Sequence, residues 1–562
     1  MTLRPFSHPT VWALLGFVLA MDLAETHAQV GLRRTSEQAF HGYTLFAPLA
    51  SNHTYLIDND GMMVRQWESD YSPGASVYLL ENGNLLRTAN PEGNEVISAG
   101  GQGGLVELFD WDGNLLWSFE LNNEAARLHH DVEPMPNGNI LMIAWENRSA
   151  EEAIEAGRDT ARITEGAVWP ERIIEVDPAA SIGEEIVWEW RLWDHVIQDY
   201  DSTKANYGVV ADHPELVNLN VPNLGADWVH ANAIDYNPEL DQILISTPSF
   251  NEIWIIDHST TTEEAAGHTE GRSGRGGDLL YRWGNPAMHN AGTEADKQLF
   301  GQHDARWIEP GFLGQRNILI FNNGRLRPGG DFSTVIEIAP PLNGDGIYEI
   351  NSKRRFDPEA PAWEYVADPD TSFFSAFISG AHRLANGNTL ICEGNTGRFF
   401  EIDARGSIVW EYMNPVAAEG ILPADAKPDQ FRNAVFRATR YASNYPGFDG
   451  RDLTPIGPIE LAPTASNFEV PSSDVGITVL GNYPNPFSTM TTIQFELVDA
   501  GTVSLTVFDL LGRLVQKPLD VKFLAGGRHG VVLTADDLAP GVYLYVIESG
   551  RSSASGRLVL TR

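Results

Sequence analysis

Short apolar runs alternate with polar turns along most of the chain, and this pattern predicts strands rather than helices. The runs recur in one order: an apolar strand, an Asn-Gly turn, a second strand, a loop, a third strand ending in Asp, a turn, and a fourth strand containing Trp. Asn-Gly is the preferred tight connection between antiparallel strands. It occurs in Glu81-Asn-Gly-Asn84, Pro136-Asn-Gly-Asn139 and Ala385-Asn-Gly-Asn388.

The third- and fourth-strand markers of this repeat return along the first 460 residues. The aspartates are Asp58, Asp110, Asp177, Asp257 and Asp403, and the aromatic residues are Trp67, Trp117, Trp188, Trp283, Trp363 and Trp410. Repeats of about 40–50 residues that each hold four strands are typical of β-propeller blades. The sequence therefore predicts an all-β protein whose main part is a six-bladed β-propeller. The segment 433–441 is the strand expected to close the ring against the first blade, and the tryptophans are expected to pack between blades.

The two ends of the chain have other compositions. Arg4 followed by the apolar run 11–21 and a small-residue site near Ala28 predicts a secretory signal over residues 1–28. The propeller is then expected over 29–458, and residues 459–476 have the composition of a linker. Alternating strands with Gly and Pro turns predict a small β-sandwich over 477–562.

Charge and cysteine content exclude several classes of function. The chain of 562 residues has a formal net charge of −38, and residues 476–562 hold equal numbers of acidic and basic side chains, so the acidity belongs to the propeller. A surface this acidic repels phosphate backbones, so we expect no nucleic-acid partner. The single cysteine, Cys392, excludes an intrachain disulfide and a thiolate metal cluster, and we expect no cofactor.

The blade topology predicts one site. In a blade, the start of the inner strand and the loop after the second strand lie at the same end of the sheet. Three inner strands begin with His130, His230 and His303, while Ala75 and Ser379 hold the equivalent places in two others. The loops after the second strands carry Arg148, Arg325 and Arg398. We therefore expect three histidines and three arginines at one mouth of the channel.

These residue types suit an anionic substrate. Imidazoles act as nucleophile, acid or base near neutral pH, and guanidinium groups match the oxygens of a sulfuryl or phosphoryl group. A metal site is less favoured, because zinc ligands are usually closely spaced or include a carboxylate. His382 lies three residues beyond an inner-strand start and is a weaker candidate, and regular strand alternation would turn His129 away from His130.

From about residue 42 to 455 the chain resembles the bacterial arylsulfotransferases, or aryl-sulfate sulfotransferases. The resemblance rests on Asp227-Trp-Val-His-Ala-Asn-Ala-Ile-Asp235, Gly301-Gln-His-Asp-Ala305, Phe321-Asn-Asn-Gly-Arg325 and Leu384-Ala-Asn-Gly-Asn-Thr-Leu390. It implies a secreted six-bladed propeller that moves a sulfuryl group from a phenolic sulfate ester to a phenol, without a nucleotide donor. The family reacts through a sulfohistidine, and by this resemblance His230, His303 and Arg325 are site residues.

One position departs from the family. Its nucleophilic histidine sits in the last blade, where this chain has Asn395-Thr-Gly-Arg-Phe399, and an arginine such as Arg398 stays protonated and cannot form the intermediate. Three outcomes stay open: another histidine takes the role, transfer is direct, or the chain binds an anionic aryl or glycan ligand without turning it over. A propeller that serves only as a scaffold for a protein partner is a further hypothesis.

Residues 477–562 resemble the C-terminal sorting domain of type IX secretion. The resemblance rests on Leu480-Gly-Asn-Tyr-Pro-Asn-Pro-Phe487, Val507-Phe-Asp-Leu-Leu-Gly-Arg513 and Leu538-Ala-Pro-Gly-Val-Tyr-Leu-Tyr545. It implies the type IX machinery as a partner and export through the periplasm and outer membrane to the cell surface or beyond.

Overall fold

The computed structural model describes residues 29–562 except 222–224, 344–345, 428–430, 464–475, 509–513, 536–537, 550–551 and 562. The predicted signal, residues 1–28, lies outside the described residues, as does most of the predicted linker. The chain divides into two compact units between Thr464 and Ala465, within the predicted linker. Nearly all its regular structure is β, and two short helices, α1 (Ala150–Glu155) and α2 (Thr262–Ala265), lie in connections of the first unit.

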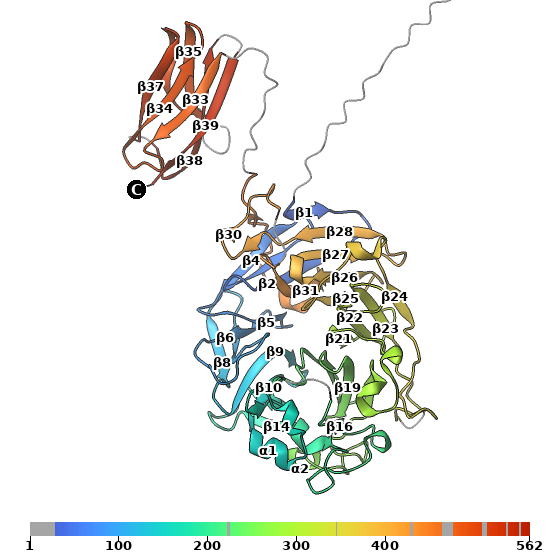
Figure 1. Ribbon diagram of the computed structural model, residues 1–562. Coiled ribbons are helices and arrows are strands. Elements are labelled where there is room, and N and C mark those ends of the chain that lie inside the picture. Colours follow the sequence, from blue (N-terminus) through green and yellow to red (C-terminus); the bar gives the residue numbers. More distant parts are fainter. Residues whose placement is uncertain are drawn as a thin grey trace, which may run out of the picture. The chain divides into compact units, whose positions relative to one another are not determined.

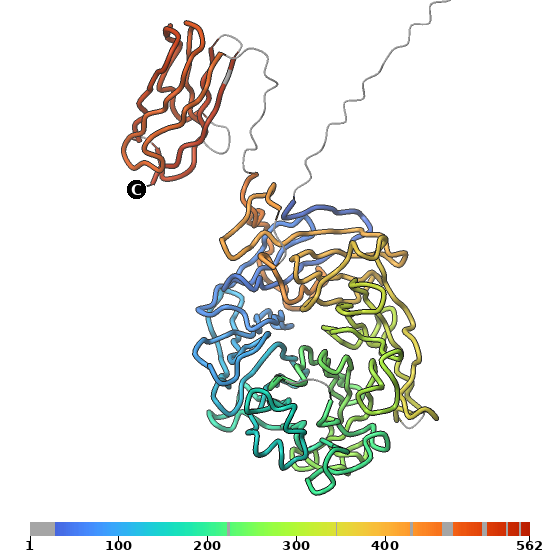
Figure 2. Tube along the Cα trace, in the orientation of Figure 1, coloured from blue at the N-terminus to red at the C-terminus, as the bar shows by residue number. Residues whose placement is uncertain are grey.

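The first unit is a β-propeller, and its described strands form six blades around a central axis (Figures 1 and 2). From the inner strand outward, blade 1 is β31 (Val435–Ala442), β2 (Gly42–Pro48), β3 (His53–Ile57), β4 (Met62–Glu68); blade 2 is β5 (Ser72–Leu79), β6 (Leu85–Asn90), β7 (Leu105–Phe109), β8 (Leu115–Glu120); and blade 3 is β9 (Ala126–Pro134), β10 (Ile140–Glu146), β13 (Glu171–Val176), β14 (Ile186–Arg191). Blade 4 is β17 (Ala233–Asn237), β18 (Gln242–Thr247), β19 (Glu252–Asp257), β20 (Tyr281–Trp283); blade 5 is β21 (His303–Trp307), β22 (Ile318–Asn322), β23 (Thr334–Ile338), β24 (Trp363–Tyr365); and blade 6 is β25 (Gly380–Arg383), β26 (Thr389–Glu393), β27 (Arg398–Ile402), β28 (Ile408–Met413).

The ring closes by strands exchanged between the two ends of the propeller sequence. The late strand β31 pairs antiparallel with β2, which confirms the closing role predicted for 433–441. The early strand β1 (Gly31–Arg34) pairs with β28 of blade 6, and β32 (Gly457–Pro458) pairs with β4. Short pairs outside the blades are β11 (Arg148–Ser149) with β12 (Ala167–Val168), β15 (Val196–Ile197) with β16 (Val217–Asn218), and β29 (Val416–Ala417) with β30 (Gly420–Ile421).

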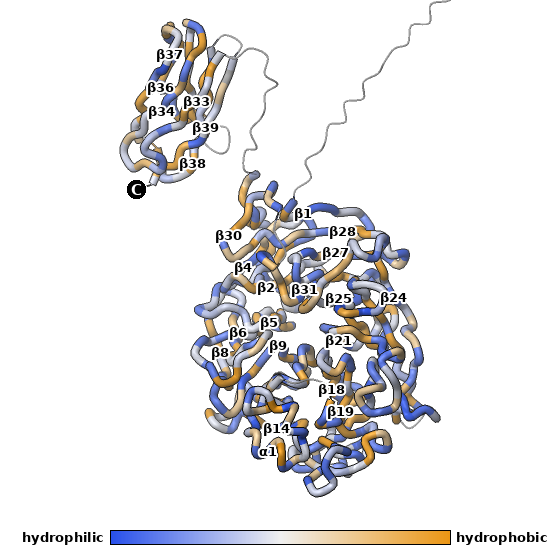
Figure 3. The backbone as a smooth tube through the Cα atoms, in the orientation of Figure 1, coloured by the Kyte–Doolittle hydropathy of each residue, from blue (hydrophilic) through white to orange (hydrophobic). Residues whose placement is uncertain are grey.

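Apolar side chains of adjoining blades pack together between the sheets. Apolar residues recur along the strands, as the colours of the backbone in Figure 3 show. Most of the repeat tryptophans reach across to the next blade, as predicted. The indole N–H of Trp67 donates to the carbonyl of Asp110 at 3.0 Å, and that of Trp410 donates to the carbonyl of Asn59 at 2.8 Å. Trp283 donates in the same way to Pro358 at 2.8 Å.

A buried ionic hub joins the inner strands. The Arg437 guanidinium in β31 contacts the Tyr78 hydroxyl of blade 2 at 2.9 Å, Asp131 of blade 3 at 2.9 Å and Asp304 of blade 5 at 3.3 Å. The two carboxylates also accept backbone N–H groups, Asp131 from Ile234 of blade 4 at 3.2 Å and Asp304 from Ala381 of blade 6 at 2.9 Å. The hub therefore links all six blades.

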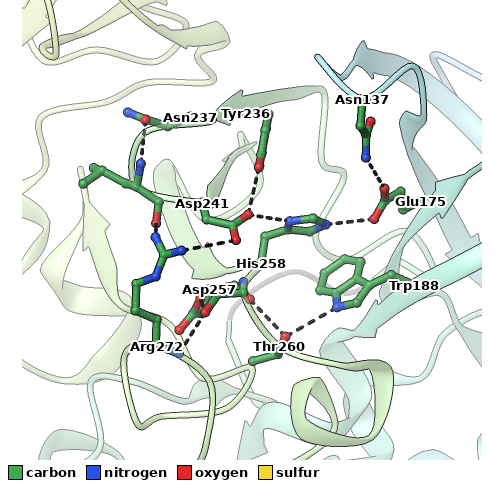
Figure 4. A network of polar contacts seen from close by, with 12 residues as sticks. Asn137, Glu175, Trp188, Tyr236, Asn237, Asp241, Asp257, His258, Thr260 and Arg272 are labelled. Carbon is green, nitrogen blue, oxygen red and sulfur yellow. Dashed lines mark hydrogen bonds and ion pairs between the residues drawn. The ribbon is translucent and has the colours of Figure 1, made fainter.

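A second ionic network ties blades 3 and 4 together at the turn end of the sheets (Figure 4). The imidazole of His258 lies between two carboxylates, with Nδ1 2.8 Å from Asp241 and Nε2 3.0 Å from Glu175. Burial by itself lowers the pKa of His258, but the hydrogen bonds and charges of these carboxylates raise it above its ordinary value. Burial raises the pKa of Glu175, but the hydrogen bond from His258, together with those from two asparagines, holds it below its ordinary value.

The second unit has two antiparallel sheets, β33 (Ile477–Tyr483), β34 (Met490–Leu497), β37 (Gly527–Thr534) and β36 (Leu514–Leu524), β35 (Gly501–Phe508), β38 (Gly541–Ser549), β39 (Ser552–Leu560). Residues alternate between buried and exposed along β34 and β35, as in strands with one face on a core. Phe495, Leu505 and Tyr545 belong to that shared core.

Removing the hub cation should destabilise the propeller strongly. In Arg437→Met, the buried Asp131 loses its ion-pair partner and Asp304 keeps only Arg306, at 2.7 Å, and breaking a buried ion pair costs about 3–5 kcal/mol. We expect a matching drop in the urea midpoint. Arg405→Met is the control, because the Arg405 side chain is 84% exposed and its ion pair with Asp403 is long, at 3.9 Å. Equal midpoints for the two variants would contradict the hub.

Replacing His258 should destabilise the protein in a pH-dependent manner. Its raised folded-state pKa stabilises the protein below the unfolded value of about 6.5, and this contribution fades as pH rises through the folded value. His258→Asn should therefore lower the melting temperature more at pH 6 than at pH 9. The exposed His41 serves as control in His41→Asn. A loss that is independent of pH would refute the charged state of His258.

Candidate active site

Three predicted histidines meet at one mouth of the propeller: His130 lies within β9 of blade 3, His230 precedes β17 of blade 4, and His303 begins β21 of blade 5. The rings of His130 and His230 lie 4.6 Å apart between centroids, at 79°. Phe436 of the closing strand lies 6.1 Å from the His130 ring and 6.4 Å from that of His303. Phe436 therefore lies next to both rings, so the closing strand contributes to the site.

The backbone at this mouth is left-handed at several residues. His130 has φ 51°, His230 has φ 59° and Asp304 has φ 50°. Such values are uncommon for residues other than glycine and often occur at functional sites. They also interrupt strand alternation, so the expectation that His129 points away from His130 is wrong: their Nδ1 atoms lie 2.9 Å apart.

A buried carboxylate stands behind this histidine pair. Nε2 of His129 lies 2.9 Å from Oε2 of Glu171, whose Oε1 accepts the N–H of Ala231 at 2.7 Å. The ring of His129 stacks on Trp145 with 3.9 Å between centroids. Burial lowers the pKa of His129 to about 3 and that of His130 well below its ordinary value, while it raises the pKa of Glu171 well above its own.

His230 has its own carboxylate. Its Nδ1 is hydrogen-bonded to Oδ2 of Asp227, and Oδ1 of Asp227 accepts the indole N–H of Trp145 at 3.0 Å. Burial alone lowers the pKa of His230, but the charge and hydrogen bond of Asp227 raise it above its ordinary value. His230 is thus the histidine of this cluster that most readily holds a proton.

His303 has both ring nitrogens occupied. Its Nδ1 lies 2.9 Å from Oδ1 of Asn323, and its Nε2 accepts the backbone N–H of Ile378 at 3.1 Å. Nδ1 therefore carries the hydrogen, and the ring is neutral. Burial lowers its pKa to about 4, although the bond to Asn323 acts in the opposite direction. His303 can support the site but presents no free lone pair.

A glycine pair covers the histidines from blade 2, in the loop after its second strand. A methyl group placed on Gly101 would lie 1.9 Å from Nε2, 2.1 Å from Cε1 and 2.3 Å from Cδ2 of His130. Three such similar distances place Gly101 over the face of the ring, so it does not cover the lone pair at the ring edge. A methyl on Gly100 would lie 3.9 Å from Cε1 of His230.

Of the predicted arginines, two are held in ion pairs. Arg148 lies 2.9 Å from Glu146 and 3.1 Å from Glu152. Arg398 lies 2.9 Å from Glu411 and 3.3 Å from Glu393. Paired with two carboxylates each, neither side chain is free to bind an anion.

Arg325 and His382 have different surroundings. Arg325 is exposed, lies two residues after the Asn323 that binds His303, and forms no hydrogen bond or ion pair with a described residue. His382 is half-buried, with Nε2 3.9 Å from Glu309, which follows the inner strand of blade 5 toward the other end of the channel. His382 therefore does not join the three histidines.

One group among the described residues has the arrangement of metal ligands. Nδ1 of His195 and Nδ1 of His268 both lie 2.8 Å from Oδ1 of Asp278, with all three ligand atoms within 4.8 Å. His195 stacks on Trp190 and bonds the carbonyl of Ala265, away from the histidine cluster. His268 and Asp278 lie in the connection before β20, and His195 lies just after β14.

Sequence reasoning missed Glu171, Asn323, Phe436 and Gly101. Asn323 lies in the motif Phe321-Asn-Asn-Gly-Arg325, so an amide two residues before Arg325 could have indicated a further site residue. Glu171 is a strand residue forty-two positions from its partner, and no sequence pattern links the two. Phe436 joins the site only because the ring closes.

Fold and site together define a β-propeller with a cluster of imidazoles at one mouth, each held by a different partner. The family model for arylsulfotransferase (ASST) matches residues 35–414. The chain belongs to the arylsulfotransferase family. A second model, the secretion system C-terminal sorting domain, matches residues 482–561, and the protein is exported by type IX secretion to the cell surface or outside.

Solved structures show remote similarity, and no curated protein matches the chain. A Bacteroides caccae protein of unknown function is 12% identical with a TM-score of 0.38, and the match covers 72% of this chain and 99% of that protein. Virginiamycin B lyase from Staphylococcus aureus is 11% identical with a TM-score of 0.31, covering 69% and 85%. Neither similarity informs the site. None of the described helices is long and apolar enough to cross a bilayer.

The site histidines should titrate differently. His303 should stay neutral down to about pH 4, while His230 should take up a proton above the ordinary value of about 6.5. Nuclear magnetic resonance of ¹⁵N-histidine-labelled protein, assigned with His230→Gln and His303→Gln, measures both. Titration of His303 near pH 6.5 would contradict the hydrogen-bond assignment.

Proposed function

We propose that this protein transfers a sulfuryl group from an aryl sulfate ester to a phenol at the histidine cluster. The observation that carries the proposal is the contact between His130 and His230, whose rings touch while separate carboxylates orient them. Nε2 of each ring forms no hydrogen bond with a described residue; His130 as a whole is buried and His230 is half-buried. Two free ring nitrogens of different basicity suit a nucleophile and a general acid.

His130 is the proposed nucleophile. When Glu171 is ionised it accepts the Nε2–H of His129, so Nδ1 of His129 accepts the Nδ1–H of His130. Nε2 of His130 then carries a lone pair. Burial also keeps this imidazole unprotonated, because it lowers the pKa of His130. His130 would thus replace the family's last-blade nucleophile, which this chain lacks.

His230 is the proposed acid and base. In the first step, Nε2 of His130 attacks sulfur, the bond from sulfur to the aryl oxygen breaks, and His230 donates its proton to the departing phenolate. In the second step, His230 takes the proton of an acceptor phenol as its oxygen attacks sulfur and the N–S bond breaks. The raised pKa of His230 supports the protonated starting form.

Arg325 and Phe436 complement the two histidines. Arg325 is the one predicted arginine left without a carboxylate partner among the described residues, and its guanidinium suits the sulfuryl oxygens. The buried Phe436 packs beside the rings of His130 and His303 and supports their positions. The type IX secretion machinery is the proposed partner for export, and it would act through the C-terminal domain.

Turnover of a chromogenic aryl sulfate tests the proposal. Wild type should release phenol faster when an acceptor phenol is present, and His130→Ala should lower kcat at least 10²-fold because the nucleophile is lost. Acid quench followed by peptide mass spectrometry should find one SO₃ on the His130 peptide. His41→Ala, at an exposed position, is the control.

Gly101→Ala gives a second variant that leaves every catalytic group in place. Its methyl would collide with the His130 ring, whereas Gly138→Ala imposes a similar positive φ (92° against 75°) in open space. Only the first should lose activity. Saturable binding of the aryl sulfate without turnover would instead support a binding protein, and undiminished turnover in His130→Ala would exclude His130.

A further inference from the structure

We propose that Glu171, His129 and His130 form a proton relay that holds one exchangeable proton and thereby decides whether Nε2 of His130 presents a lone pair or an N–H. This inference rests on the proposed function and extends it, because it assigns roles to two residues that never touch the substrate. Glu171 and His129 are positioning residues, and they act through His130.

The contacts form an unbroken line from carboxylate to imidazole edge. Oε2 of Glu171, the two nitrogens of His129 and Nδ1 of His130 are joined by two contacts of 2.9 Å each. The side chains of His129 and Glu171 are 0% and 1% exposed, so water cannot replace either member. The N–H of Ala231 fixes Oε1 of Glu171, which leaves Oε2 to face His129.

The line has two consistent proton arrangements. With Glu171 ionised, His129 carries its hydrogen on Nε2, His130 carries its own on Nδ1, and Nε2 of His130 is a lone pair. If a proton arrives at that nitrogen, the Nδ1 hydrogen of His130 passes to His129 and the Nε2 hydrogen of His129 passes to Glu171. The result is a neutral carboxylic acid and two neutral imidazoles, so the relay takes up a proton without creating a buried imidazolium.

Burial favours storage of the proton on Glu171. It is the main cause of the raised pKa of the Glu171 carboxyl; the hydrogen bond from Ala231 lowers that pKa, and the charges of Asp227 and His230 act in opposite directions. His130 faces the rings of His230 and His303 and the Arg437 guanidinium, all of which disfavour a positive charge on it. His129 also lies near Arg127, whose guanidinium is bonded to the carbonyls of Gly103 and Ile97.

The relay has a defined task in sulfuryl transfer. When Nε2 of His130 bonds to sulfur, the ring gains a positive charge and its Nδ1 hydrogen becomes acidic. That hydrogen moves to His129, and the hydrogen on Nε2 of His129 moves to Glu171, which leaves an N-sulfoimidazole whose ring is uncharged and whose sulfo group keeps its negative charge. When the acceptor oxygen takes the sulfuryl group, both hydrogens return, and the electron pair of the N–S bond returns to Nε2 of His130.

Glu171→Gln tests the relay with minimal change in shape. Because Oε1 must still accept the N–H of Ala231, the new amide NH₂ faces His129 and donates to its Nε2. His129 then donates from Nδ1, and Nε2 of His130 is fixed as N–H. A wrong imidazole tautomer costs a catalytic triad about 10⁴-fold in kcat. We expect a loss of about 10²–10⁴-fold at unchanged KM.

Glu175→Gln is the matched control. Glu175 lies on the same strand, β13, is also buried, and also binds a histidine, His258, but belongs to the network between blades 3 and 4. It should keep wild-type kcat. Melting temperatures of both variants report whether either protein is misfolded, and Glu171→Asp, which keeps the charge, should recover part of the kcat lost in Glu171→Gln.

A readout without turnover separates the relay from the proposed function. Diethyl pyrocarbonate reacts only with an imidazole lone pair, and peptide mass spectrometry measures its addition to His130. In wild type the rate should rise with pH as Glu171 ionises, and in Glu171→Gln it should be low at every pH. Equal rates in the two proteins would overturn the relay even if turnover is seen. If wild type shows no turnover but the pH-dependent difference holds, the proposed function fails and the relay stands.

Discussion

The arrangement of this propeller depends on a single buried cation at its axis. Arg437 lies on the strand that closes the ring, yet its guanidinium contacts residues of blades 2, 3 and 5. The two aspartates that bind it also accept backbone hydrogens from blades 4 and 6. Inner strands carrying buried carboxylates would repel one another without it. Closure therefore supplies the counter-charge that the other blades need.

The hub also sets the position of the site. Each charged hub residue follows a site residue in the sequence: Asp131 follows His130, Asp304 follows His303, and Arg437 follows Phe436. Fixing the hub side chains fixes the backbone one residue away, where the left-handed conformation of His130 directs its ring toward His230. The hub contacts thus hold in place the backbone that carries the imidazoles. Precision at the site follows from contacts that are not themselves catalytic.

The repeat pattern predicted the blades and the closing strand, because turns and apolar periods are local properties. It also brought His130, His230 and His303 to one mouth, since blade topology converts equivalent positions into neighbours. The same reasoning placed Arg398 and Arg148 beside them, but could not show that Glu393 and Glu146 neutralise these side chains. His129 was misjudged because alternation fails where His130 adopts a positive φ. Glu171 was not predicted, because its buried hydrogen bond to His129 joins two strands that are far apart in the sequence.

The late position of the closing strand has a consequence for the biogenesis of the protein. Phe436 and Arg437 are synthesised after His130, His230 and His303, and until they arrive Asp131 lacks its ion-pair partner. A growing or truncated chain that ends before β31 holds every imidazole of the cluster but not their arrangement. The histidine cluster is therefore in place only once β31 has closed the ring.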